Sequence, residues 1–273
     1  MVSKRSIMQA LGALVVTASL GCLAAAPAAA QAPSILQGVL QRGTLRVAVL
    51  GSLPPYSRVL PTGEAEGYDI EIAKRLAEAL KVKPEFVITD IPGRVTSLQT
   101  RKVDVTIADF TRNVERSTTV AFTNPYLVTN MRLMVRTDSP YKSIAEANEA
   151  GIKVAISRGG TAEQAVPKNM PKAQVVRFNN QSDELSALLT GQVDAMAEDD
   201  FYNGRAIKDH EGKLRQVEGT LARAEIAIGA PAGDPEWLRV LNLFVDQFNA
   251  SGDNKKLFVQ WFGFEQPPIQ VKY

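Results

Sequence analysis

Cysteine and histidine are almost absent from this sequence. Cys22 is the one cysteine and His210 the one histidine among 273 residues. The chain therefore offers no disulfide framework, no zinc–thiolate site and no thiol nucleophile once Cys22 is removed with a leader. Because His210 lies in the polar segment 208–212, we expect no Ser-His-Asp triad. We also expect no metal centre and no cofactor.

The sequence also lacks a large charge of either sign. The formal net charge is +2, and Lys4 and Arg5 account for that excess. No basic stripe points to nucleic acid, and no polybasic helix points to a membrane surface. We therefore expect neither nucleic acid nor anionic lipid as a partner.

No apolar run is long enough for a convincing membrane span, which needs about 20 residues. Residues 1–30 instead predict a secretory signal peptide, with Lys4 and Arg5 before an apolar stretch and an Ala-x-Ala site at residues 28–30. Cleavage after Ala30 is favoured over lipid anchoring at Cys22. We therefore expect an exported, periplasmic protein.

The remaining sequence alternates between short apolar strands and amphipathic helices. Strands are expected at residues 45–50, 84–88, 103–108, 153–156, 174–178 and 193–197, with a mixed segment at 117–125 and an extended one at 131–136. Helices are expected at the C-terminus, at residues 235–251 and 255–262, with Leu238, Leu241, Val245 and Phe248 on one apolar face. This alternation predicts α/β units with parallel sheets.

The segment 67–80, Gly-Tyr-Asp-Ile-Glu-Ile-Ala-Lys-Arg-Leu-Ala-Glu-Ala-Leu, predicts a helix with one apolar face. Asp69 is expected to cap it, since a carboxylate can accept the unpaired N–H groups of a first turn. The residue sequence of this segment closely resembles the signature of the bacterial extracellular solute-binding proteins of the polar amino-acid class (family 3).

The resemblance implies a type II periplasmic-binding-protein-like fold, with two lobes of mainly parallel sheet flanked by helices and joined by two hinge strands. Lobe one would be residues 31–132 plus 226–273, and lobe two residues 133–225. The hinges would fall near 131–134 and 223–228. The implied function is capture of a polar amino acid by hinge closure and delivery to an ABC-transporter permease. We expect a monomer without catalysis.

Two segments carry the ligand residues that the resemblance implies. In 104–116, Thr111 matches the family's key hydroxyl, and Arg116, five residues later, matches the arginine that clamps an α-carboxylate. In 193–199, Asp199 matches the acid that receives the ligand ammonium, and its neighbours Glu198 and Asp200 are expected at the rim. The alternative for the first segment is a solvated surface turn, and for the second an acidic loop.

Thr161 matches a third position, the Gly-Thr turn that opens a helix and offers donors to the carboxylate. An ordinary helix cap would use the same residues. Tyr56 is the candidate for the aromatic wall found in many members, since Leu50 and Leu53 occupy the earlier positions of that loop.

Selectivity is predicted from arginines. Arg94 resembles part of a segment common in binders of acidic amino acids, and Arg112 and Arg158 could add positive charge, so an acidic ligand of the Glu/Asp type is favoured. Asp109 departs from the small residue that the family usually has. Its carboxylate could repel a ligand carboxylate, or pair with Arg112, Arg116 or a cationic ligand.

Two other functions remain open. Cyclohexadienyl and arogenate dehydratases resemble these binders, and Asp109, Glu198 or Asp200 could serve as a general acid. A carrier that presents its ligand to a signalling receptor would have the same lobes.

Overall fold

The computed structural model describes residues 34–269, and the predicted leader with Cys22 lies outside them. The strands are β1 (Thr44–Leu50), β2 (Ser52–Leu53), β3 (Ser57–Val59), β4 (Ala65–Glu66), β5 (Lys83–Thr89), β6 (Val105–Thr106), β7 (Val120–Arg136), β8 (Lys153–Ser157), β9 (Gln174–Phe178), β10 (Ala195–Asp199), β11 (Leu214–Gln216) and β12 (Ala222–Pro231). The helices are α1 (Ile35–Arg42), α2 (Tyr68–Ala79), α3 (Gly93–Gln99), α4 (Val114–Ser117), α5 (Ile144–Glu149), α6 (Ala162–Asn169), α7 (Gln181–Leu189), α8 (Asp200–Asp209), α9 (Pro235–Ala250) and α10 (Asp253–Phe262). None of these helices combines the length and apolar character that a membrane crossing requires.

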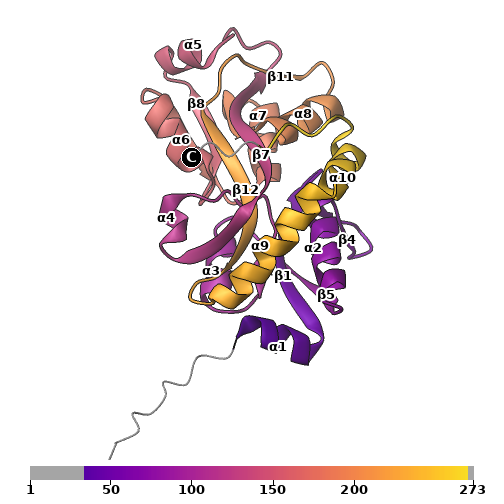
Figure 1. Ribbon diagram of the computed structural model, residues 1–273. Coiled ribbons are helices and arrows are strands. Elements are labelled where there is room, and N and C mark those ends of the chain that lie inside the picture. Colours follow the sequence, from indigo (N-terminus) through magenta and orange to yellow (C-terminus); the bar gives the residue numbers. More distant parts are fainter. Residues whose placement is uncertain (1–33, 270–273) are drawn as a thin grey trace, which may run out of the picture. The chain divides into compact units, whose positions relative to one another are not determined.

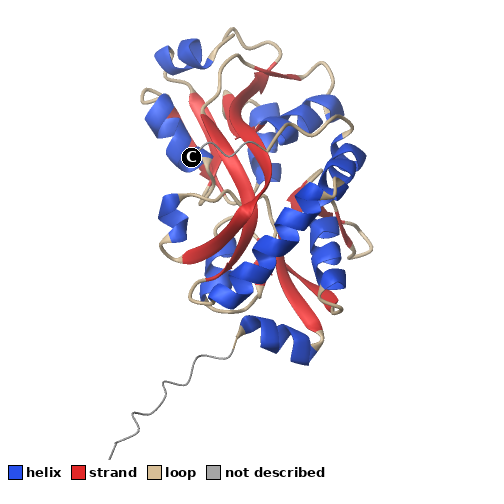
Figure 2. Ribbon diagram, viewed as in Figure 1, coloured by secondary structure: helices blue, strands red, loops and turns tan. Residues whose placement is uncertain are grey.

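The main sheet has nine strands in the order β5-β1-β6-β12-β7-β10-β8-β9, with β11 beside β7. It contains two groups of parallel strands, and helices lie around it (Figures 1 and 2). β1 pairs in parallel with β5 and β6, and β8 pairs in parallel with β9 and β10. A helix connects the strands within each group, as parallel pairing requires. We call the group of β1, β5 and β6 the first lobe and that of β8, β9 and β10 the second. The predicted two-lobed α/β fold is confirmed.

β7 and β12 run side by side as an antiparallel pair between the two groups of strands (Figure 1). Near one end of the pair, β12 contacts β6 at Gly229; near the other, β7 pairs with β10 over residues 131–135. The ladder between β7 and β12 is irregular after Ile226. The predicted lobe boundaries and hinge positions stay predictions, but the separate segments predicted at 117–125 and 131–136 are wrong, since β7 is one continuous strand of 17 residues.

Helix α2 begins where a loop of the first lobe folds back onto it. The N–H groups of Tyr68 and Asp69 donate to the carbonyls of Pro55 and Tyr56, at 3.0 and 2.9 Å. These carbonyls satisfy donors that a helix start otherwise leaves unpaired. The predicted cap by Asp69 is therefore wrong.

The Asp69 side chain is instead fully buried and ties two other segments together. One carboxylate oxygen accepts from Tyr126 Oη at 2.8 Å and the other from the Asp109 N–H at 2.8 Å. Burial raises the pKa of Asp69 to about 7. This carboxyl group fixes the backbone of the turn that follows β6.

The C-terminal helices pack on the first lobe. The apolar face predicted for 235–251 is confirmed at Leu241, Val245 and Phe248, which are buried, whereas its fourth member, Leu238, is half-buried. Trp237 is fully buried, and its indole N–H donates to the carbonyl of Asp104 at 3.0 Å. These contacts anchor the strand β6 from which the turn to Asp109 departs.

Candidate functional site

A cavity lies where β6 of the first lobe and β8 and β10 of the second end. Its polar lining comes from both lobes and from β7: Arg94, Asp109, Thr111, Thr129, Ser157, Thr161, Gln181, Glu198 and Asp199. Ile91, Met131, Ala162, Ala224 and Ile226 supply most of the apolar wall. The C-terminal ends of parallel strands meet at one edge of a sheet, which is where α/β proteins commonly bind ligands.

Asp109 and Thr111 lie in the turn between β6 and α4. The turn is held against β12, because Ala227 donates to the Phe110 carbonyl at 3.1 Å and Arg112 N–H donates to the Glu225 carbonyl at 2.9 Å. Asp109 has a φ of +45°, a left-handed conformation that Asp and Asn adopt more readily than most residues. The predicted hydroxyl, Thr111, lines the cavity and is mostly buried.

Thr161 meets Thr111 across the two lobes. The Thr161 hydroxyl donates to the Thr111 hydroxyl at 2.8 Å, and no backbone group of α6 uses the Thr161 side chain as a cap. Both threonines line the cavity. Two of the predicted site residues, far apart in sequence, are thus brought together.

Arg116 extends from α4 towards the second lobe. Its guanidinium donates to the carbonyl of Thr111 at 2.6 Å and to the carbonyl of Gly159 at 2.8 Å, and it lies 5.3 Å from the centre of the Phe110 ring. Burial lowers the pKa of Arg116 to about 9. It does not line the cavity wall directly, so its contact with a ligand carboxylate stays a prediction.

Asp199 ends β10 and caps α8. Its Oδ1 accepts from the N–H groups of Phe201 and Tyr202, at 2.9 and 3.1 Å, and from Tyr56 Oη at 2.9 Å. Its Oδ2 has no hydrogen-bond partner among the described residues, although the side chain is 2% exposed. Burial, and then the neighbouring Glu198 and Asp200, raise the pKa of Asp199 to about 8.

Tyr56 acts on the cavity through Asp199. Its ring is fully buried and packs edge-on against Phe262, with ring centroids 5.3 Å apart. The ring is not part of the cavity lining. Tyr56 as an aromatic wall against the ligand stays a prediction.

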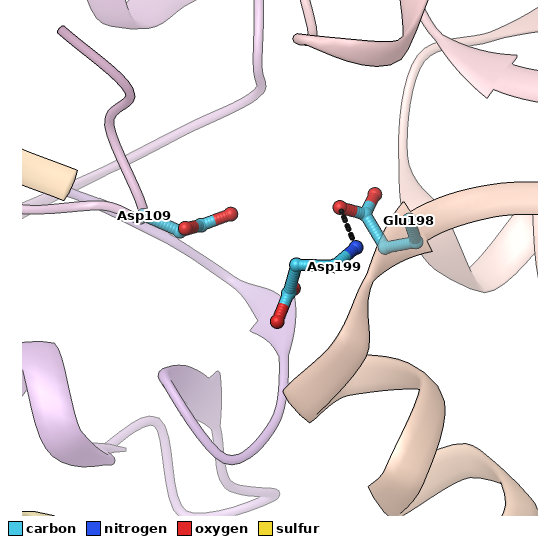
Figure 3. Close-up of side chains that lie close together, drawn as sticks. All are labelled: Asp109, Glu198 and Asp199. Carbon is cyan, nitrogen blue, oxygen red and sulfur yellow. Dashed lines mark hydrogen bonds between the residues drawn. The ribbon is translucent and has the colours of Figure 1, made fainter. Parts of the chain in front are cut away.

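Three carboxylates meet in the cavity (Figure 3). One carboxylate oxygen each of Asp109, Glu198 and Asp199 lie within 4.8 Å of one another, which is close enough to hold a cation jointly. The prediction that Glu198 lies at the rim is wrong, since it is 6% exposed and lines the cavity. Asp200 turns away and accepts from both nitrogens of Asn130, at 3.2 and 2.9 Å.

The pKa of each carboxyl group in this cluster is raised. For Asp109 the causes are burial and then the charges of Asp199 and Glu198, and for Glu198 the main cause is burial. Sequence spacing alone gave no sign of this cluster, because one member comes from the first lobe and two from the second.

Arg94 is the one cationic side chain among the described residues that line the cavity. Its Nε donates to the Ile91 carbonyl at 3.1 Å, and its Nη1 donates to the carbonyls of Ala108 and Asp109, at 3.0 and 2.8 Å. Burial lowers its pKa. The other two arginines considered for selectivity lie elsewhere: Arg112 pairs with Glu225 at 2.8 Å, and Arg158 is exposed.

Sequence reasoning missed Thr129, Ser157 and Gln181, which line the cavity. Ser157 is the last residue of β8, at the same edge as Asp199, and its hydroxyl donates to the buried carboxylate of Glu184. The ends of the predicted parallel strands were a usable signal for Ser157. Thr129 lies inside the long strand β7, which the sequence did not reveal.

The fold and the cavity agree with the family that the sequence resembles. Residues 45–264 match the bacterial extracellular solute-binding proteins, family 3. The chain belongs to this family. An L-arginine-binding protein of Pseudomonas aeruginosa is 28% identical over 81% of this chain and 88% of the relative.

Relatives also include an enzyme. A cyclohexadienyl dehydratase of Pseudomonas aeruginosa is 28% identical over 72% of each chain. Among solved structures, the ancestral amino acid-binding protein AncCDT-1, a precursor of cyclohexadienyl dehydratase, is 32% identical with a TM-score of 0.78, covering 84% of this chain and 100% of its own. This family fold therefore carries both binding and catalysis.

Proposed function

We propose that this chain is a periplasmic binding protein that closes its lobes on a polar amino acid and delivers it to the permease of an ABC importer. Membership of the solute-binding family supports the transport role. The lobe boundaries proposed for closure are residues 31–132 plus 226–273 and residues 133–225. The protein acts as a monomer, exported by the predicted signal peptide.

One observation carries the proposal: Oδ2 of Asp199, a buried carboxylate oxygen of the cavity, has no partner among residues 34–269, and paired hydroxyls from the two lobes line the same cavity. Asp199 receives the ligand ammonium. Thr111, Thr161 and Arg116 receive its α-carboxylate. An unpaired buried charge is costly, so a ligand ammonium at Asp199 is stabilising.

A thermal-shift screen against the common amino acids tests this role, on protein made from the full chain and refolded to remove carried ligand. A ligand at 100 times its dissociation constant stabilises the folded state by about 2.7 kcal/mol. Arg116→Ala is expected to abolish the shift, measured from the variant's own unliganded melting temperature, because the substitution also removes the contacts with the Thr111 and Gly159 carbonyls. An unchanged shift would place the carboxylate elsewhere.

The acidic side chain predicted from the sequence remains to be tested by the same screen. The cavity lining has three carboxylates and one guanidinium, a balance that disfavours a second negative charge on the ligand. Arg94 is also engaged with three carbonyls. We therefore regard an acidic amino acid as the weaker candidate.

A dehydratase is the second candidate, and the raised pKa values of Asp109 and Glu198 favour it, since a general acid must hold a proton near neutral pH. Incubation with prephenate and with arogenate tests it. Consumption of either substrate, lost in Glu198→Gln, would replace the binding role. Asp200, the third acid considered, binds Asn130 and is no longer a candidate.

A further inference from the structure

The charge lining the cavity is unbalanced. Three carboxylates approach one another within 4.8 Å, and Arg94 is the one cation among the described lining residues. Arg94 donates to the carbonyls of Ile91, Ala108 and Asp109. Like charges at this separation disfavour ionisation of all three carboxyl groups unless positive charge is added.

Polar atoms of the cavity also lack partners. Asp199 Oδ2 and Asp109 Oδ1 have no hydrogen-bond partner among the described residues, and neither has the hydroxyl of Thr129, which is 1% exposed and lines the same cavity. Buried polar groups in native proteins nearly always have a partner. Thr129 comes from β7 rather than from the acidic cluster, so it is independent evidence that a polar ligand fits here.

The hydrogen bonds that hold the turn at Asp109 do not use its carboxylate, although the charge of Arg94 favours the ionised form of that carboxylate. Its N–H donates to Asp69 and its carbonyl accepts from Arg94, so the backbone alone makes the contacts that hold the turn. The side chain points towards Glu198 and Asp199 (Figure 3). A smaller hydroxyl side chain would preserve those backbone bonds and leave the cavity less negative.

We propose that Asp109 and Glu198 form a subsite for a positively charged side chain, so that the bound amino acid carries a guanidinium or a second ammonium. This inference rests on the proposed function, in which Asp199 already receives the α-ammonium. Asp109 belongs to the first lobe and Glu198 to the second. A side-chain cation between them binds both lobes and stabilises closure.

The test compares ligands that differ in charge and little else. L-arginine and L-citrulline share length and shape, but a neutral urea group replaces the guanidinium; L-lysine and L-norleucine form a second pair. Isothermal titration of the refolded protein is expected to give a dissociation constant at least about tenfold lower for one cationic ligand than for its neutral partner, because a buried charge pair is lost in the neutral one.

Matched variants assign the effect to the subsite. Asp109→Asn keeps a residue that tolerates the left-handed conformation, and it is expected to remove most of the preference for the cationic ligand. Glu198→Gln provides an independent variant with the same expectation. Asp200→Asn removes a nearby charge that faces Asn130 rather than the cavity, and it is expected to retain the preference.

The other outcomes are separable. If L-glutamine or L-glutamate binds and neither cation does, the subsite is refuted and the amino-acid role stands. Equal affinity within both ligand pairs, or an equal loss in Asp109→Asn and Asp200→Asn, also refutes it. Tight binding of calcium or manganese chloride alone, lost in Asp109→Asn, would identify a metal site instead. If no amino acid binds the wild type, the proposed function itself fails.

Discussion

Ligand binding is expected to release a proton from the carboxylate cluster. In the absence of ligand the pKa of Asp199 is raised from 3.8 to about 8, first by burial and then by the charges of Glu198 and Asp200. The hydrogen bond from Tyr56 opposes this shift. A ligand ammonium favours the ionised carboxylate, so the bound state holds one proton fewer than the free state below pH 8. Affinity therefore rises with pH and levels off above pH 8.

The size of the effect follows from the fraction of Asp199 that is ionised. With a pKa of about 8, roughly 1% of the free protein has the carboxylate at pH 6 and about half at pH 8, so affinity rises about 50-fold over that range, or about 2 kcal/mol. Asp109 and Glu198 share the proton with Asp199, because their pKa values are raised as well. The measured curve belongs to the cluster as a whole.

Isothermal titration with the amino acid that gives the largest thermal shift measures the affinity and the release of protons at pH 6, 7 and 8. Two buffers of different ionisation enthalpy yield the number of protons released, which is expected to approach one at pH 6. Tyr56→Phe removes the hydrogen bond that lowers the pKa of Asp199 and is expected to move the rise to higher pH. An affinity constant within twofold from pH 6 to 8, with no proton released, would refute the reasoning.

Two further predictions concern Gly67, just before helix α2, and the buried carboxyl group of Asp69. Gly67→Ala is expected to lower the free energy of unfolding by about 2 kcal/mol or more in urea titrations. The reason is that Gly67 has a φ of +135° and that an added Cβ would lie 2.3 Å from the Tyr56 carbonyl oxygen. An unchanged urea midpoint would contradict this prediction. For Asp69, the folded pKa of about 7 exceeds the unfolded value of 3.8, so its contribution to the free energy of unfolding is full below pH 4 and is lost as the pH rises to 7. Between pH 4 and 8, the free energy of unfolding of Asp69→Asn is therefore expected to gain up to about 4 kcal/mol relative to that of the wild type. Parallel curves of stability against pH for the two proteins would contradict this.

The sequence could predict the elements whose pattern is local. The apolar face of α9 and the alternation of strands with helices depend on residue spacing, and the structure confirms both. The cap of α2 was predicted wrongly because an aspartate at this position can either cap the helix or, as Asp69 does here, be buried and accept hydrogen bonds from other segments. The choice between them depends on the carbonyls of Pro55 and Tyr56, which lie in another segment.

The long strand β7 was missed for a similar reason. Pro125 lacks an N–H donor and normally interrupts a central strand. Here Pro125 is the partner of Ala227, and the register of the pairing with β12 shifts on both sides of that pair, so the missing donor falls at an irregularity of the ladder. Nothing in the sequence of β7 alone indicates where its partner strand is irregular.

The candidate site shows which of its residues could be predicted from their spacing in the sequence. Thr111, Thr161 and Asp199 were matched one by one, and all three line one cavity. Glu198 was predicted at the rim, whereas it lines the cavity, although neighbouring residues of a strand normally point to opposite faces. At Asp199 the strand ends and α8 begins, so both carboxylates reach the same space.

The proposed closure of the lobes would link these observations to ligand choice. Contacts across the lobes, such as Thr161 with Thr111 and Arg116 with the Gly159 carbonyl, accompany the approach of Asp109 to Glu198 and Asp199. The approach costs free energy unless the cluster takes up a proton or a cation. A ligand shifts the equilibrium towards closure by as much as it favours the closed state over the open one. A cationic side chain removes this cost, whereas a neutral amino acid must bind with the proton retained. The charge of the ligand and the pH are therefore expected to act on closure through the same three carboxylates.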